Sequence, residues 1–433
     1  MQVVSGFSKK SKTEKLDYLS QFLDSPEKVK ARLQSFWHQN LDEQKVFDDF
    51  SENTLTNYYF PYGIMPNLLL NNKTYFVPMV IEESSVVAAA ANAASFWAKR
   101  GGVKSEVVAS TKVGQVHFSW EGDKEKLFSF FKNNKAELKN NISPLLQSMK
   151  KRGGGLLDID LKETGPNLFQ LFCTFETCDA MGANFINTVL EALGRELVLS
   201  HAKLSEGEKT IEIIMAILSN YTPECLVRSY VECPIQDLED GKLGMSVDQF
   251  VKKFNQALKI SHMDIYRATT HNKGIFNGID AVVLATGNDF RAIEACGHAF
   301  ASRKGQYRGL SELTLKEGKF KFFLDVPLAL GTVGGLTSLH PLAKTSLEIL
   351  NNPSAKELMM IASAVGLLQN FAALKSLVTC GIQRGHMKMH LLNILNHLGA
   401  TELEQEQVRD NFNDKVISFK EVRDFLMGLR TIH

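Results

Sequence analysis

The segment "KVGQVHFSW" (112–120) predicts a β-strand, because Val116, Phe118 and Trp120 alternate with more polar residues. Five segments with helix or strand patterns follow it in the order helix, strand, strand, helix, strand: "DKEKLFSFFKNNKAEL" (123–138), "GGLLDIDLKE" (154–163), "NLFQLFCTFET" (167–177), "MGANFINTVLEALGREL" (181–197) and "KTIEIIMAIL" (209–218). The order β-α-β-β-α-β is that of the ferredoxin-like split motif. We therefore expect residues 108–216 to form a small domain inserted into the rest of the chain.

The sequence on either side of this insert is richer in helix signals. Residues 60–85 predict strands joined by an Asn-Asn turn, and the alanine-rich run that follows predicts a buried helix ending at 101–102. Capping boxes mark helices near both ends of the chain, at Ser11/Glu14, Thr401/Glu404 and Ser418/Glu421. We expect an α+β protein with a helix-rich large domain (1–107 and 217–375), the inserted domain, and a small helical C-terminal domain (376–433).

The composition excludes several classes of function. Of 433 residues, 49 are Lys or Arg and 48 are Asp or Glu, and the net charge of +1 gives no electrostatic footprint for nucleic acid or an acidic membrane. The N-terminus lacks the apolar core of a signal peptide, and the most apolar window, 86–98, is too short to span a bilayer. We expect a cytoplasmic protein with no nucleic-acid or membrane partner.

Motifs for metals and nucleotides are incomplete. The pair in "CTFETC" (173–178) has no second Cys or His pair to complete a zinc site, so we expect free thiols and no metal. The glycine-rich stretches "KRGGGL" (151–156) and "GTVGGL" (331–336) fail the spacing of nucleotide-binding loops. A dinucleotide would have to bind elsewhere, such as the helix start in "DAMGANFINT" (179–188), where phosphate could approach backbone N–H groups. Close helix–strand packing explains that glycine equally well.

The segment "THNKGIFNGIDAVVLATGNDFRAIEA" (270–295) places Lys273 before a small-residue apolar run and Asp289 after it. Taken alone, Lys273 can be a solvated lysine and Asp289 the N-cap of the next helix. A straight helix between them would separate the two by about 24 Å. They can share a site only if the chain bends between them, and three glycines allow this: Gly274, Gly278 and Gly287.

Five long stretches stand in order along the chain: "PMVIEESSVVAAAANAA" (78–94), "DAMGANFINT" (179–188), the 270–295 segment, "LDVPLALGTVGG" with "HPLAKTSLEIL" (324–350), and "GLLQNFAALKSLVTCGIQRGHMKMH" (366–390). Together they resemble the 3-hydroxy-3-methylglutaryl-coenzyme A (HMG-CoA) reductase family, in its soluble bacterial class II branch. The resemblance runs from about residue 6 to the C-terminal segment. One departure is Thr56 in "ENTLT" (52–56), where the family usually has glycine at its dimer interface.

The resemblance implies an inserted domain that binds a nicotinamide cofactor without a Rossmann fold, a C-terminal flap, and a homodimer, or a higher assembly of dimers, whose interface builds the active site. The positions matching the family's catalytic residues are Glu83, Lys273, Asp289 and the flap residue His386. Those matching residues that hold the hydroxymethylglutaryl group are Ser85, Arg267, Asn277 and Gln369. Those in the cofactor motif are Asp179, Met181, Gly182 and Asn184, with Asn220 as a cofactor or relay position.

The implied reaction reduces the thioester of HMG-CoA to mevalonate and coenzyme A by two hydride transfers. Lys273 would stabilise the oxyanion, a contribution of about 3–4 kcal/mol, with Asp289 beside it to keep it charged and oriented. A buried Glu83 would donate the proton in the aldehyde step. His386, on the closing flap, would protonate the coenzyme A thiolate.

The cofactor and the direction of reaction stay open. Lys151 and Arg152 lie in "QSMKKRGGG" (147–155) with no acid nearby, which favours the 2′-phosphate of NADPH; a solvated basic turn and NADH are the alternatives. The same fold could oxidise mevalonate with NAD and coenzyme A. A coenzyme A acyltransferase or thioesterase would instead use Cys296 or Cys380 as nucleophile. A non-catalytic acyl-CoA-binding homologue would be expected to lack some matched residues, and none is missing.

Overall fold

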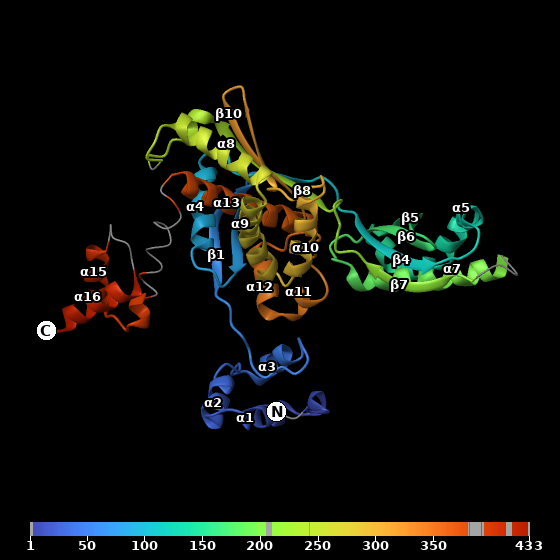
Figure 1. The fold of residues 1–433 in the computed structure, drawn as a ribbon, viewed down its shortest axis with the longest axis horizontal. Coiled ribbons are helices and arrows are strands. Elements are labelled where there is room, and N and C mark those ends of the chain that lie inside the picture. Colours follow the sequence, from blue (N-terminus) through green and yellow to red (C-terminus); the bar gives the residue numbers. More distant parts are fainter. Residues whose placement is uncertain are drawn as a thin grey trace.

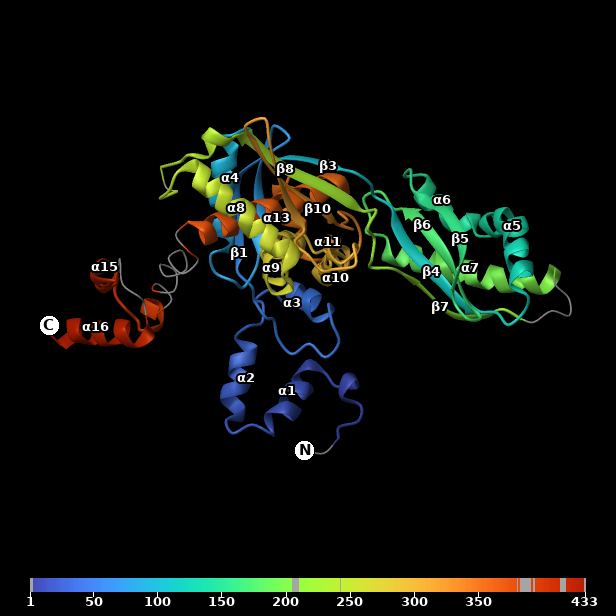
Figure 2. The same ribbon diagram turned by 45° about the horizontal axis from the view of Figure 1, so that its top comes forward.

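The computed structural model describes residues 3–204, 210–241, 243–379, 381, 391, 394–412 and 418–431. Hydrophobic side chains in the described part of the chain form a large central cluster, a second cluster in the insert, and a small one near the C-terminus. The helices of the N-terminal arm leave the centre in a further direction (Figures 1 and 2): α1 (Lys12–Ser20), α2 (Pro26–Gln34) and α3 (Leu41–Asp48). The arrangement is α+β, as the sequence predicts.

A β-hairpin opens the central part. Strands β1 (Tyr62–Leu70) and β2 (Lys73–Val80) pair antiparallel. Asn71 and Asn72 form the turn with φ of 48° and 69°, which confirms the predicted Asn-Asn turn. The alanine-rich helix α4 (Val86–Ala98) follows β2 and is buried on the face that carries Ala90, Ala94 and Trp97.

A four-stranded antiparallel sheet lies behind the central helices. Its strands are ordered β3-β8-β10-β9: β3 (Lys104–Val107), β8 (Leu226–Pro234), β10 (Lys319–Pro327) and β9 (Ser311–Lys316). Residues 217–375 were predicted to be helix-rich, but three of these strands (β8, β9 and β10) lie in that range. The prediction therefore missed the sheet of the central domain.

Helix α13 (Ala355–Val378) runs through the core, and α4, α8 (Val247–Met263) and α9 (Ile265–Ala285) pack against it (Figure 1). The backbones of α9 and α13 nearly touch, because a Cβ on Gly278 would lie 2.9 Å from Val365 O. Among the described helices, α13 alone is long and apolar enough to cross a membrane, and 78% of its apolar window is buried inside the protein. It therefore has the character of a core helix.

Three shorter helices complete the centre: α10 (Phe290–Ala301), α11 (Leu336–Leu339) and α12 (Pro341–Ile349). Helix α10 begins a few residues after α9 ends and packs against it. A Cβ on Gly297 of α10 would lie 2.2 Å from the ring of Phe276 on α9, so this contact requires glycine.

The insert has the predicted strand and helix order. Its elements are β4 (Lys112–Ser119), α5 (Lys124–Asn141), α6 (Ser143–Lys150), β5 (Gly155–Gly165), β6 (Leu168–Glu176), α7 (Ala183–Leu204) and β7 (Glu212–Leu218). The sheet order β5-β6-β4-β7 is that of a ferredoxin-like split motif. The sequence did not predict α6, which begins with Pro144 in its first turn after α5 ends.

The C-terminal part lies apart from the core, on the side opposite the insert (Figure 1). Helices α15 (Glu402–Asn411) and α16 (Phe419–Thr431) pack on each other around Val408 and Val422. The capping box Thr401/Glu404 is complete, and Ser418 and Glu421 are also hydrogen-bonded to each other. These helices are those that the capping signals predicted.

Candidate active site

Lys273 on α9 meets Glu83, which lies in the turn before α4. The Lys273 ammonium forms an ion pair with Glu83 Oε2, and Asn277 Nδ2 lies 3.4 Å from the same oxygen. Asn277 follows Lys273 by one turn of α9, so both side chains are on one face of the helix. The side chains of Lys273 and Glu83 are 57% and 37% exposed, which leaves both within reach of a ligand.

Two neighbouring polar atoms are buried without a partner. Ser85 Oγ and Gln369 Oε1 have no hydrogen bond with any described residue. Ser85 stands at the start of α4 with φ 76°, and its hydroxyl does not cap the helix. Gln369 lies on α13 where Gly278 of α9 approaches it, since a Cβ on that glycine would be 3.0 Å from Gln369 Cβ. Buried polar atoms without partners are costly, so each of these two atoms is available to hydrogen-bond a bound molecule.

Arg267 is a half-buried cation on α9. It makes no ion pair or hydrogen bond with the described residues, and burial lowers the pKa of its guanidinium. An unpaired guanidinium of this kind suits a carboxylate. It lies six residues before Lys273, about 9 Å along the helix axis, and no described contact joins the two.

The structure separates Asp289 from Lys273 within one chain. Helix α9 continues unbroken through Gly274 and Gly278, so the chain does not bend there; it turns at Gly287, whose φ is 68°. From Lys273 to the end of α9 is about 18 Å along the axis. Asp289 instead caps α10, accepting hydrogen bonds from Arg291 N and Ala292 N, and pairs with the Arg291 side chain. The N-cap role that the sequence allowed for Asp289 is therefore confirmed.

Residues 177–182 connect β6 to α7, and together with the first two residues of α7 we call them the 177–184 loop. Asp179, Met181 and Gly182 lie in the connection, and the exposed Asn184 lies in the first turn of α7. A Cβ on Gly182, with φ 92°, would lie 2.5 Å from Thr177 Cγ2, so only glycine fits. The carboxylate of Asp179 accepts a hydrogen bond of 2.8 Å from Ala355 N, at the first turn of α13. The loop is thus anchored to the central domain, and Gly182 has a packing reason for its identity.

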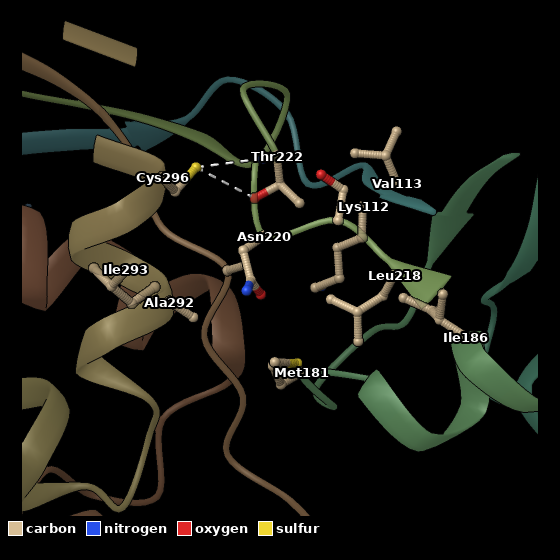
Figure 3. Close-up of a pocket in the computed structure, with 12 residues that line it drawn as sticks. Lys112, Val113, Met181, Ile186, Leu218, Asn220, Thr222, Ala292, Ile293 and Cys296 are labelled. Carbon is tan, nitrogen blue, oxygen red and sulfur yellow. Dashed lines mark hydrogen bonds between the residues drawn. The ribbon is translucent and has the colours of Figure 1, made fainter. Parts of the chain in front are cut away.

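A small, mainly apolar cavity of about 20 Å³ lies between the insert and α10 (Figure 3). Met181 and Asn220 line it from the insert side, and Ala292, Ile293 and Cys296 line it from α10. The cavity therefore joins two residues predicted to bind a cofactor with the helix that Asp289 caps. The sequence indicated Cys296 only as an alternative nucleophile and did not indicate Ala292, Ile293 or Lys112, because only tertiary packing places these residues at the cavity.

The basic turn after α6 adjoins the 177–184 loop. Lys151 and Arg152 are exposed, and Cys178 Sγ donates a hydrogen bond of 3.1 Å to Arg152 O. A Cβ on Gly154 would lie 2.4 Å from Glu176 O, so the turn lies directly against the end of β6. This placement sets two cations at the edge of the candidate cofactor loop.

The thiols give no support for a cysteine nucleophile. The five described cysteines are free: Cys173, Cys178, Cys225, Cys233 and Cys296. Cys296 is 3% exposed, and burial raises the pKa of its thiol, which disfavours the reactive thiolate. Cys380 and the predicted flap histidine, His386, lie outside the described residues. Among the described residues, no group of three or more His, Cys, Asp or Glu side chains could hold a metal ion.

Comparisons with known proteins agree with one another. The family model for hydroxymethylglutaryl-coenzyme A reductase matches residues 12–391. The chain is 36% identical over 413 residues to 3-hydroxy-3-methylglutaryl-coenzyme A reductase from Archaeoglobus fulgidus, covering 94% of this chain and 89% of that protein. A structure of the class II enzyme from Streptococcus pneumoniae, bound to NADPH in open conformations, matches with a TM-score of 0.71 and 37% identity, covering 87% of this chain and 100% of that chain. A second structure of the Streptococcus pneumoniae reductase gives a TM-score of 0.72 at 35% identity, covering 99% and 100%.

Proposed function

This chain belongs to the hydroxymethylglutaryl-coenzyme A reductase family, and we propose that it reduces HMG-CoA to mevalonate and coenzyme A with NADPH. It is an oxidoreductase of the mevalonate pathway. The observation that carries the proposal is the ion pair of Lys273 and Glu83, with the unpaired atoms Ser85 Oγ and Gln369 Oε1 close to it in the fold. A cation, a carboxyl group and spare hydrogen-bonding atoms are what a thioester with a polar acyl group needs.

The residues of the candidate site divide the chemistry between them. NADPH, when bound, would supply a hydride to the carbonyl carbon, which would leave negative charge on the oxygen. The Lys273 ammonium stabilises that charge and Asn277 adds a donor beside it. Glu83 hands a proton to the oxygen at the aldehyde step. Ser85 and Gln369 orient the hydroxymethylglutaryl group, and Arg267 binds its carboxylate.

We assign the cofactor to the cavity of Figure 3 and to the loop beside it. Met181 and Asn220 would hold the nicotinamide end in this mainly apolar space, with Asp179, Gly182 and Asn184 on the loop side. Lys151 and Arg152 stand where a 2′-phosphate could pair with them, which favours NADPH over NADH. The NADPH bound to the Streptococcus pneumoniae enzyme supports the same choice.

We further propose a cytoplasmic homodimer with shared active sites. Aromatic side chains are exposed on the N-terminal arm and hairpin: Tyr58 (85%), Tyr59 (54%), Phe60 (43%) and Phe76 (58%). Such a surface is typical of a subunit contact. Because Lys273 and Asp289 are far apart in one chain, a site that uses both needs two copies. We propose a substrate-binding and dimerisation domain at 1–107 and 217–375, a cofactor domain at 108–216, and a flap at 376–433 that carries His386.

A coupled assay tests the function. The protein is mixed with HMG-CoA and NADPH, and the nicotinamide absorbance and the released thiol are followed together. Two equivalents of NADPH consumed for each thiol released support the reductase. Thiol release without NADPH oxidation would favour a thioesterase instead, and the same assay with mevalonate, coenzyme A and the oxidised cofactor measures the reverse direction.

A further inference from the structure

The 177–184 loop touches the central domain through the segment 331–333. Thr332 N donates a hydrogen bond of 2.8 Å to Asp179 O, and Ala180 pairs with Val333 in a parallel bridge. A Cβ on Gly331 would lie 2.4 Å from Met181 N. The two backbones are therefore in direct contact, and a displacement of residue 331 is passed to Met181.

Asn288 holds Gly331 by both of its backbone polar groups. Asn288 Nδ2 donates to Gly331 O at 3.0 Å, and Gly331 N donates to Asn288 Oδ1 at 2.9 Å. Asn288 is half-buried and directly precedes Asp289, whose carboxylate caps α10. Asn288 contacts Gly331, and Gly331 contacts Met181 on the insert side of the cavity. Asp289 caps α10 through Ala292 N, and Ala292 lines the opposite side of the same cavity.

We propose that Asn288 is a positioning residue for hydride transfer. By clamping Gly331, it fixes the 177–184 loop relative to α10 and so sets the spacing of Met181 and Ala292 across the cavity of Figure 3. This inference rests on the proposed function, in which that cavity receives the nicotinamide. Small errors in the spacing of reacting groups lower rates steeply, so a single amide side chain away from the Lys273–Glu83 pair can control turnover.

The chain offers a matched control for the loss of such a clamp. Asn71 makes the same pair of contacts with Ser105: Nδ2 to Ser105 O at 2.8 Å, and Ser105 N to Oδ1 at 3.0 Å. It lies in the turn of the β1–β2 hairpin and neither lines the cavity nor contacts the Lys273–Glu83 pair. Alanine at Asn71 removes the corresponding two hydrogen bonds at an exposed position, and its φ of 48° adds backbone strain, so this variant is also expected to lose stability.

The first experiment measures amide hydrogen exchange in the unliganded full-length protein. In Asn288→Ala, the amides of Met181 and Thr332 should exchange about tenfold faster than in the wild type, whereas in Asn71→Ala they should not change. This result does not depend on catalysis. Unchanged exchange at both amides in Asn288→Ala would overturn the clamp, whatever the enzyme does.

The second experiment compares steady-state kinetics and direct NADPH binding. Asn288→Ala should raise the KM and Kd for NADPH about tenfold and lower kcat by a similar factor, while the KM for HMG-CoA changes less than about twofold. Asn71→Ala should keep all of these values. A fall in kcat with both KM values unchanged, or wild-type kinetics, would overturn the proposal. A wild-type protein that does not oxidise NADPH with HMG-CoA would refute the function while leaving the exchange result valid.

Asn288→Asp keeps the size of the side chain and the acceptor for Gly331 N, but places an oxygen against Gly331 O. It should show the same split between the two KM values, and it serves if the alanine variant does not fold. In Gly331→Ala, the added Cβ pushes directly on Met181 N and displaces the 177–184 loop. The kinetic effects of Gly331→Ala and Asn288→Ala should therefore not add in a double-mutant cycle. Full additivity of the two would contradict a shared path.

Discussion

Lys273 and Glu83 are 190 positions apart in the sequence, and the ammonium of the first is ion-paired with the carboxylate of the second. The contact exists because α9 and the turn before α4 both pack beside α13. It places a fixed positive charge and a proton carrier at one point. Both side chains remain partly exposed, so the pair is available to a substrate and contributes little to folding.

Replacement of Lys273 by alanine should remove most of the activity and little of the stability. We expect kcat to fall about 100- to 1000-fold with a small change in the KM for HMG-CoA, because the cation acts on charge that develops in the transition state. The free energy of unfolding of this variant should stay within about 1 kcal/mol of the wild-type value. Lys273→Arg, which keeps the charge, should retain more activity than the alanine variant; more than a tenth of wild-type kcat in Lys273→Ala would contradict the assignment.

Two inactive variants should restore activity when they are mixed as subunits. Lys273 and Asp289 are separated along α9 in one chain, so Lys273→Ala and Asp289→Ala together should form hybrid dimers with one intact site. Each hybrid keeps one of its two sites, so the purified hybrids should have about half of the wild-type activity per dimer. Exchange is achieved by co-expression of differently tagged chains and measured after tandem purification.

The control for this mixing experiment comes from the ion pair itself. Lys273 and Glu83 are joined within one chain, so Lys273→Ala and Glu83→Ala should not rescue each other. Rescue in that second mixture, or none in the first, would mean that the active site is not divided between subunits as proposed.

Reversing the charge of the basic turn should change cofactor choice. Lys151→Glu with Arg152→Glu should raise the KM for NADPH about tenfold or more and leave the KM for NADH nearly unchanged, because only NADPH carries the 2′-phosphate. Lys132→Glu is the control, an exposed lysine on α5 away from the 177–184 loop. Equal effects of the double variant on both cofactors would remove these two residues from phosphate binding.

The stability of the protein should fall as the pH rises towards 8, because of Asp280. Burial raises the pKa of this carboxyl on α9 from the ordinary aspartate value of 3.8 to about 8, and the nearby Glu294 adds to the rise. The folded state therefore binds a proton that the unfolded state releases between these values, and the stabilising effect of that proton is lost as pH rises through 8. Asp280→Asn should remove this dependence.

Urea unfolding at pH 5 and pH 8.5 measures the effect. We expect Asp280→Asn to gain up to about 4 kcal/mol of unfolding free energy relative to the wild type on going from the lower to the higher pH, because three pH units separate pH 5 from the raised pKa. Asp248→Asn, on the exposed start of α8, should show no such change. An identical pH slope in wild type and Asp280→Asn would show that the carboxyl is ionised in the folded protein.

The local patterns explain which parts of the fold were predictable. The insert was recognisable because each strand, such as β4, alternates apolar and polar residues over a short span. The sheet β3-β8-β10-β9 was not, because β8 and β10 come from segments about 90 positions apart and their pairing is fixed by tertiary contacts. The pattern of residues within one short segment does not show which distant strand it pairs with, or in which register.

The same distinction applies to the site. The carried-over positions Glu83, Lys273 and Asn277 come together in one chain, whereas Asp289 stands alone at the start of α10. Spacing along the sequence indicated that Lys273 and Asp289 could share a site only if the chain bends between them, and the unbroken α9 shows that this prediction was wrong at Gly274 and Gly278. The cavity beside α10 was beyond prediction, since its walls come from five separate segments.

Helix α13 gives the molecule a rigid strut. Its first-turn amide at Ala355 is hydrogen-bonded to Asp179, and its far end at Val378 is where the C-terminal segment leaves the core. A helix of 24 residues spans about 36 Å, and most of this one is buried and cannot bend freely. The loop that carries Asp179 therefore holds one end of a buried helix, and the opposite end of that helix is where the chain departs towards α15 and α16.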